Sequence, residues 1–116
     1  MLHIKNVEEL KVQWEQLINQ LSNQFNADLD LQGVLFLIGV QELGKGFGKF
    51  SKDQKQDLMH IATCKLFSLS GHYELAHVDE EGWPHYRLVQ PVPFASLKEQ
   101  ERMLKWHMLE YFESDG

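Results

Sequence analysis

The chain has 116 residues, a mass of 13.6 kDa and a net charge of −6. A chain of this length buries roughly two-thirds of the surface that it exposes when unfolded, so it can form a core without a disulfide or a metal ion. Its 43% hydrophobic and 24% charged residues are ordinary for globular proteins, which excludes a wholly disordered chain. The acidic balance argues against a protein that wraps nucleic acid by neutralising phosphates. We therefore expect a single globular domain over residues 1–116.

The N-terminal residues and the single cysteine indicate a cytoplasmic protein. No apolar segment typical of a secretory signal follows Met1. The longest apolar run, residues 34–40, is far shorter than the roughly 20 residues that span a bilayer. Cys64 has no second cysteine with which to form an internal disulfide, and this favours a reducing compartment. We expect no contact with a membrane.

Two helices are predicted in the first part of the chain. Apolar residues recur at steps of three and four over residues 7–25, which predicts an amphipathic helix with Asn6 as its N-cap. Residues 29–43 are apolar on nearly every side, which predicts a buried helix. A buried strand over residues 34–40 is the alternative, because so short an apolar run does not fix the period.

A glycine-rich loop and a third helix follow. Glycines alternate with other residues over 44–48, and this pattern predicts a loop. Ser51 is placed to cap a helix that runs to about Ser70 and ends before Gly71. Residues 39–46 nearly match the phosphate-binding P-loop, but Gly46 stands where that motif needs a hydroxyl to hold Mg²⁺. The sequence therefore does not indicate a nucleotide triphosphatase.

Residues 73–89 predict an antiparallel β-hairpin around an acidic turn at residues 79–82. The register that collects apolar side chains on one face pairs Val78 with Trp83, Leu75 with Tyr86, Tyr73 with Leu88 and Glu74 with Arg87. This register places His77 and His85 on opposite faces of the hairpin. The two histidines are then not expected to bind a metal together.

A fourth helix is predicted over residues 97–113, where Ser96 and Glu99 form a capping-box pattern. Besides one apolar stripe, this helix carries Met103, Trp106 and Leu109, which widen its apolar surface beyond what one packing face needs. The fold expected from these elements is mainly α (α+β). It has about four helices in a compact bundle and one antiparallel β-hairpin between the third and fourth helices.

Two groups of side chains are candidates for ligand sites. Lys45, Lys49 and Lys52 lie in or next to the glycine-rich loop, where lysines and glycine amides are candidates for anion binding. His60 and Cys64 are four residues apart on a helix, and His107 and Glu110 are three apart on another, so each pair is a weak candidate for metal binding. A zinc site needs three or four ligands, and neither pair completes one. We therefore assign no metal, cofactor or catalytic residue.

The last helix gives the preferred functional interpretation, a small cytoplasmic interaction or scaffold domain that self-associates as a homodimer or binds a protein partner. Met103, Trp106, Leu109 and the hairpin-tip residue Trp83 are the candidate contact residues. Two alternatives stay open. One is a winged-helix-like nucleic-acid-binding module, which the order of elements suggests but the acidic hairpin tip disfavours. The other is a metal-binding enzyme that uses the histidines.

Overall fold

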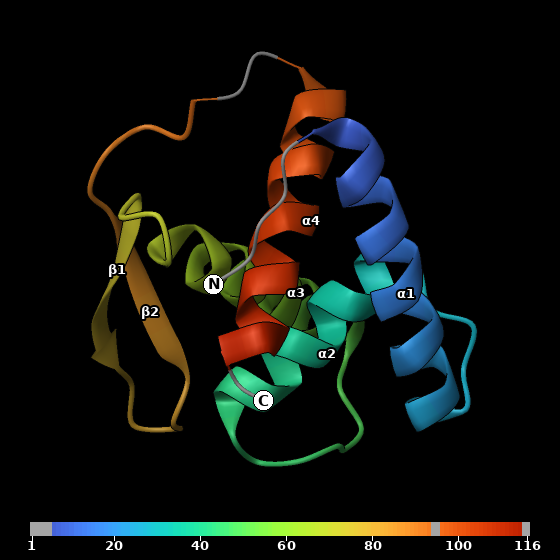
Figure 1. The fold of residues 1–116 in the computed structure, drawn as a ribbon. Coiled ribbons are helices and arrows are strands. Elements are labelled where there is room, and N and C mark those ends of the chain that lie inside the picture. The colour runs from blue at the N-terminus through green and yellow to red at the C-terminus, as the bar shows by residue number, and fades with distance from the viewer. Residues whose placement is uncertain (1–5, 94–95, 115–116) are drawn as a thin grey trace. The chain divides into compact units, whose positions relative to one another are not determined.

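A computed structural model of the chain describes residues 6–93 and 96–114. In this part of the chain it contains four helices and one two-stranded antiparallel hairpin (Figure 1). The elements are α1 (Val7–Phe25), α2 (Leu31–Leu43), α3 (Lys52–Ser68), β1 (Tyr73–Val78), β2 (Pro84–Leu88) and α4 (Leu97–Ser114). The predicted α+β class and the place of the hairpin between the third and fourth helices are confirmed. Residues 34–40 are helical, so the strand alternative was wrong.

The elements group into two units. The first holds α1 and α4, and the second, Leu31–Val92, holds α2, α3 and the hairpin. The expectation of one domain over residues 1–116 stays a prediction. None of the helices in the described part of the chain combines the length and the hydropathy needed to span a bilayer.

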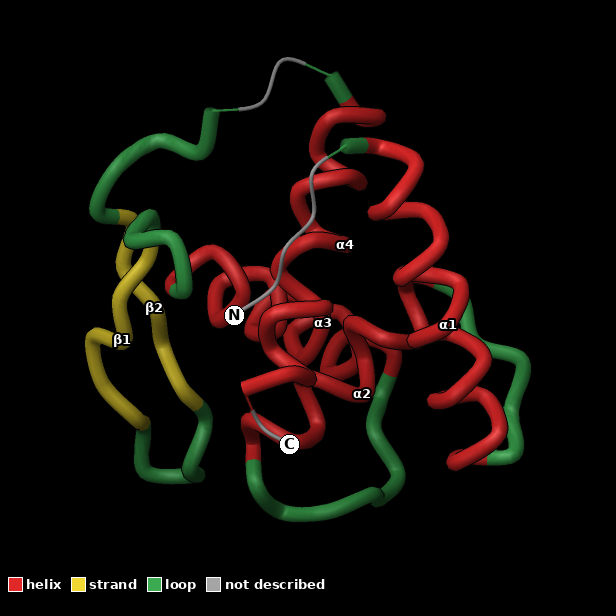
Figure 2. Tube along the Cα trace, in the orientation of Figure 1, coloured by secondary structure: helices red, strands yellow, loops and turns green. Residues whose placement is uncertain are grey.

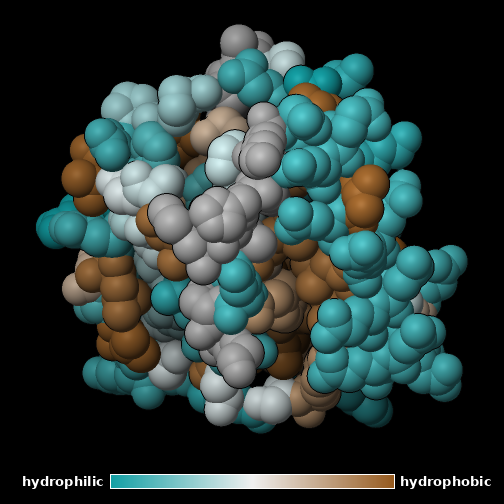
Figure 3. Space-filling view, in the orientation of Figure 1, coloured by the Kyte–Doolittle hydropathy of each residue, from teal (hydrophilic) through white to brown (hydrophobic). Residues whose placement is uncertain are grey.

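In the first unit, α1 and α4 lie side by side and begin at the same end (Figures 1 and 2). Both starts are capped as predicted. The Asn6 side chain accepts a hydrogen bond from the Glu9 N–H at 3.0 Å, and the Ser96 hydroxyl accepts one from the Glu99 N–H at 3.1 Å. Each first turn carries acidic side chains, such as Glu8 in α1, which interact favourably with the positive end of the helix dipole. The outward surface of α1 is mostly hydrophilic (Figure 3).

In the second unit, α2 and α3 approach each other very closely at Gly39. A Cβ atom built on Gly39 would lie 2.2 Å from the Leu58 carbonyl oxygen, which is less than any real contact allows. Glycine is therefore required at this crossing. Ser51 caps α3 in a reciprocal capping box, in which the side chains of Ser51 and Gln54 each accept the other's backbone N–H.

The hairpin register agrees with the prediction at its outer pairs and differs at its tip. Tyr73–Leu88, Glu74–Arg87 and Leu75–Tyr86 pair as predicted, and Glu74 and Arg87 form an ion pair. The register then shifts between Leu75 and His77, so that His77 pairs with His85 and Val78 with Pro84 rather than with Trp83. The prediction of opposite faces for the two histidines was wrong, because one extra residue in β1 changes the side to which later side chains point. Hydrophobic side chains remain at the surface in the region of the hairpin (Figure 3).

Candidate functional site

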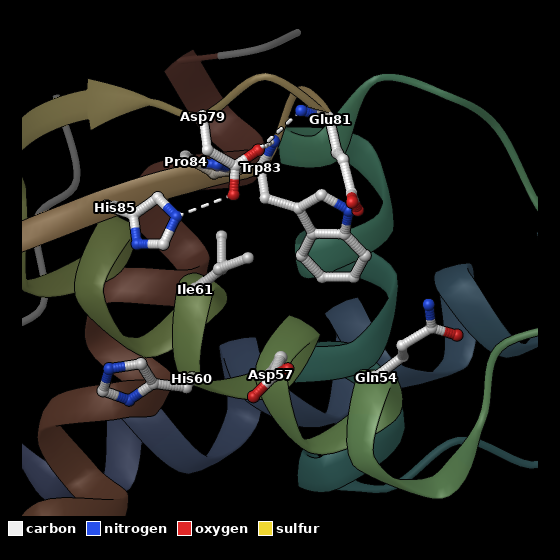
Figure 4. Close-up of a pocket in the computed structure, with 9 residues that line it drawn as sticks. All are labelled: Gln54, Asp57, His60, Ile61, Asp79, Glu81, Trp83, Pro84 and His85. Atoms are coloured by element: carbon white, nitrogen blue, oxygen red, sulfur yellow. Dashed lines mark hydrogen bonds and ion pairs between the residues drawn. The ribbon is translucent and has the colours of Figure 1, made fainter.

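A pocket of about 370 Å³ lies between α3 and the tip of the hairpin (Figure 4). We call it the hairpin pocket. It is lined by Gln54, Asp57, His60 and Ile61 from α3 and by Asp79, Glu81, Trp83, Pro84 and His85 from the turn and β2. The α3 residues follow one another at helical spacing, which places them on one face of the helix. The pocket therefore combines carboxylates, imidazoles and an indole on two facing elements.

Asp79 organises the turn that forms one wall of the hairpin pocket. Its Oδ1 atom accepts hydrogen bonds from the backbone N–H groups of Glu81 and Trp83, both at 2.9 Å. Its Oδ2 atom lies 2.8 Å from His85 Nε2. The pKa of Asp79 is lowered below its ordinary value. The largest cause is the hydrogen bond with His85, and the next is the hydrogen bond from the Trp83 N–H. The carboxylate is therefore charged at neutral pH.

The charged Asp79 carboxylate also determines which ring nitrogen of His85 carries a proton. An ionised carboxylate only accepts hydrogen bonds, so His85 Nε2 must carry the proton that is shared with Asp79. In the neutral imidazole, Nδ1 is then the acceptor. The His85 ring stacks on that of His77 with 4.6 Å between the ring centroids and 5° between the planes. Stacking and the hydrogen bond together hold the His85 ring in one orientation.

Trp83 is half-buried and forms the aromatic wall of the hairpin pocket. It packs against the buried cluster of Val40, Leu43 and Leu58, which belongs to α2 and α3. Figure 4 shows the indole projecting from the turn over the space between the hairpin and α3. The indole is therefore in place before any ligand arrives. Its predicted role as a contact with a protein partner stays a prediction.

Of the lysines predicted to bind an anion, Lys45 has a hydrogen-bond partner within the chain. The Lys45 ammonium donates a hydrogen bond to the Glu81 carbonyl oxygen, which ties the glycine-rich loop to the hairpin turn. Lys49 and Lys52 are exposed. Gly82 adopts a positive φ of 89° beside the Lys45 side chain, a conformation that glycine adopts without strain. Lys45 therefore supports the turn in this structure.

The two predicted metal-binding pairs are placed differently by the structure. His60 Nε2 lies 3.6 Å from Cys64 Sγ, so the helical spacing does bring this pair together. Burial raises the pKa of the Cys64 thiol to about 11, which keeps it protonated at neutral pH. His107 Nδ1 instead lies 2.6 Å from the Met103 carbonyl oxygen. Glu110 is half-buried. Within residues 6–93 and 96–114, no three His, Cys, Asp or Glu residues are arranged to hold a metal ion.

A second concave surface lies between α1 and α4, with a volume of about 300 Å³. We call it the α1–α4 groove. It is lined by Asn6, Val7, Leu10, Glu99, Arg102, Met103 and Trp106. The sequence-predicted residues Met103 and Trp106 thus lie in one groove, and the Trp106 side chain is 43% exposed. Leu109 is buried and does not line the groove.

No protein-family model, curated protein or solved structure matches this chain. A functional proposal therefore draws on the chemistry of the hairpin pocket and the α1–α4 groove. The hairpin pocket was missed from the sequence because the register shift in β1 was not foreseen. A local signal for Asp79 did exist, since an aspartate that begins a turn ending in glycine commonly accepts backbone hydrogen bonds within that turn.

The lowered pKa of Asp79 predicts how the hairpin tip responds to acid. Because the pKa of Asp79 is lower in the folded state than in the unfolded state, its hydrogen bonds stabilise the tip at pH values above the unfolded-state pKa. That contribution is lost as the pH falls through the folded pKa. We expect the amide resonances of Glu81 and Trp83 to shift with a midpoint below about pH 4, the ordinary aspartate value. NMR titration measures this midpoint. Asp79→Asn should abolish the transition and Asp53→Asn should leave it intact, whereas a midpoint at or above the ordinary value would contradict the assignment.

Proposed function

We propose that the protein is a small interaction domain that self-associates through the α1–α4 groove. The observation that carries this proposal is Trp106, which exposes 43% of its surface at the edge of the groove. Met103 and Val7 extend the apolar surface around it. Tryptophan and methionine are enriched in the buried centres of protein interfaces, and a contiguous apolar surface rimmed by polar residues marks a contact site.

The charges beside the groove favour a second copy of the chain as the partner. Glu99 and Arg102 are one helical turn apart on α4, so the rim of the groove carries both signs of charge. In a two-fold symmetric contact each surface meets an identical surface. Arg102 of one copy can then approach the Glu99 carboxylate of the second copy. The α1 and α4 helices of two copies would together form a four-helix arrangement around a shared apolar centre.

Replacing Trp106 with glutamine should weaken self-association by about 2 kcal/mol, or about 30-fold in the dissociation constant, which is the effect expected of a central interface residue. Light scattering after size-exclusion chromatography should then show the mass falling towards that of the monomer. Val12→Gln is a suitable control, because Val12 is 54% exposed on α1 but does not line the groove. Equal masses for the native chain and Trp106→Gln, or equal losses for both variants, would contradict this assignment of the interface.

A further inference from the structure

We propose that the hairpin pocket binds an organic cation, an ammonium or guanidinium group carried on an apolar stem. This inference is independent of the α1–α4 groove and of self-association. It concerns only the second unit of the chain, where α3 and the hairpin tip form the two walls of the pocket. The aromatic wall of the pocket, the apolar surface beside it and the charges around it each favour such a ligand.

The aromatic wall is preorganised for a ligand. The Trp83 backbone N–H donates to Asp79, and its side chain packs on the buried cluster of Val40, Leu43 and Leu58. A ring that is already ordered loses little conformational freedom when a ligand arrives, and this saving appears as affinity. Among aromatic side chains, tryptophan attracts cations most strongly. Trp83 therefore gives the pocket a fixed surface that suits a positively charged group.

The pocket also has room and apolar surface for the stem of such a ligand. Its volume of about 370 Å³ lies within the range of small-molecule sites. Ile61 from α3 and Pro84 from β2 supply apolar surface beside the indole. Figure 4 shows the Ile61 side chain extending from α3 toward the hairpin and the Trp83 indole extending from the turn into the same space. The apolar stem of the ligand would leave water when it contacts this surface, and this transfer favours binding.

The charges around the pocket select a cation over an anion. Asp57 contributes a carboxylate from α3 and Glu81 contributes one from the turn, so the two lie on different walls. Asp79 is negatively charged but is committed to His85 and two backbone N–H groups. No lysine or arginine is among the described residues that line the pocket. The three carboxylates of the pocket outweigh the Lys45 ammonium, which donates to the Glu81 carbonyl oxygen at the turn, so negative charge prevails there and concentrates cations.

Three probes with one benzyl or phenyl ring and different charges test this proposal: benzyltrimethylammonium, benzyl alcohol and benzoate. NMR titration of the native chain follows the indole N–H of Trp83 and the amides of the lining residues. We expect saturable shifts from the cation with a dissociation constant on the order of 1 mM. The alcohol should bind at least about fivefold more weakly, and benzoate should give no saturable shift. Equal binding of alcohol and cation, or no saturation by the cation at about 10 mM, would overturn the proposal.

Substitution of one wall residue tests where the cation binds. Asp57→Asn should weaken binding of benzyltrimethylammonium about fivefold, because it removes one carboxylate from the pocket. Asp53→Asn is the matched control, since it removes the same charge from the same helix outside the pocket. Both positions are exposed, so neither change is expected to unfold the protein. Equal affinity in the two variants would contradict binding at the hairpin pocket.

Two sources of the cation can be separated with probes that share a guanidinium group. Butylguanidine represents a free small molecule and N-acetyl-arginine amide represents the side chain of a protein, and each carries one positive charge. Tighter binding of N-acetyl-arginine amide would identify a protein side chain as the ligand, and tighter binding of butylguanidine would identify a free small molecule. Failure of both to compete with benzyltrimethylammonium would contradict a guanidinium ligand and restrict the ligand class to ammonium groups.

Discussion

Gly39→Ala is expected to destabilise the protein by about 3 kcal/mol, the upper end of the usual cost of overpacking. An alanine in a helix normally adds up to about 1 kcal/mol of stability relative to glycine, so propensity alone predicts the opposite sign. Here the new Cβ atom would lie 2.2 Å from the Leu58 carbonyl oxygen and 2.9 Å from the Leu58 Cβ atom. A backbone atom cannot rotate away as a side chain can. The two helices must therefore separate, and the contacts around the crossing weaken.

Urea unfolding followed by circular dichroism measures this loss as a lower midpoint at an unchanged slope. Gly48→Ala provides the control, because a Cβ atom at Gly48 meets nothing within 4 Å and its φ is not in the left-handed region. That variant should stay within about 0.5 kcal/mol of the native chain. A Gly39→Ala protein as stable as the native one would show that α2 and α3 do not cross at this distance.

Leu58→Ala is also expected to lower the free energy of unfolding by about 3 kcal/mol, but for a different reason. Leu58 is completely buried and forms one cluster with Val40 and Leu43, against which Trp83 packs. Removing its side chain forfeits the burial and leaves a cavity that the neighbours fill only partly. Because Trp83 rests on this cluster, the indole should also lose its fixed position in the hairpin pocket.

The same unfolding measurement applies to Leu58→Ala, and the Trp83 indole resonance reports the local effect. Leu69→Ala is the matched control near the end of α3, where the leucine side chain is 42% exposed. The control should lose only about 1 kcal/mol, since 42% of the Leu69 surface stays in water on folding and its truncation leaves no enclosed cavity. Equal losses from Leu58→Ala and Leu69→Ala would contradict the position of Leu58 at the centre of this cluster.

Much of the helical structure could be predicted because its signals are local. Asn6, Ser51 and Ser96 each accept the backbone hydrogen bond that a capping residue is expected to accept. The period of the apolar residues identified α1, and the polar segments between elements marked the connections. These features depend on residues a few positions apart, so the sequence alone carries them.

The features that form the hairpin pocket depend on contacts between elements, and the sequence did not reveal them. A single extra residue near Ala76 changes the register of the hairpin tip. The alternation of polar and apolar residues along the strand does not reveal this extra residue. The stacking of His77 on His85 follows from that change. Gly39 was also uninformative in sequence, because a glycine inside a helix acquires its meaning only from the backbone that crosses it.

Only some of the apolar residues singled out on the last helix lie in the α1–α4 groove. Met103 and Trp106 line the α1–α4 groove, whereas Leu109 is buried. Periodicity shows that a helix carries more apolar residues than one face holds. It does not show which of them the rest of the chain covers, because that depends on tertiary packing.

We propose that a second copy of the chain covers the α1–α4 groove. The most direct test is the mass of the native protein in solution, measured by multi-angle light scattering over a range of concentrations. We predict a mass of twice 13.6 kDa at high concentration, falling towards 13.6 kDa on dilution. A mass of 13.6 kDa at every concentration would contradict the claim.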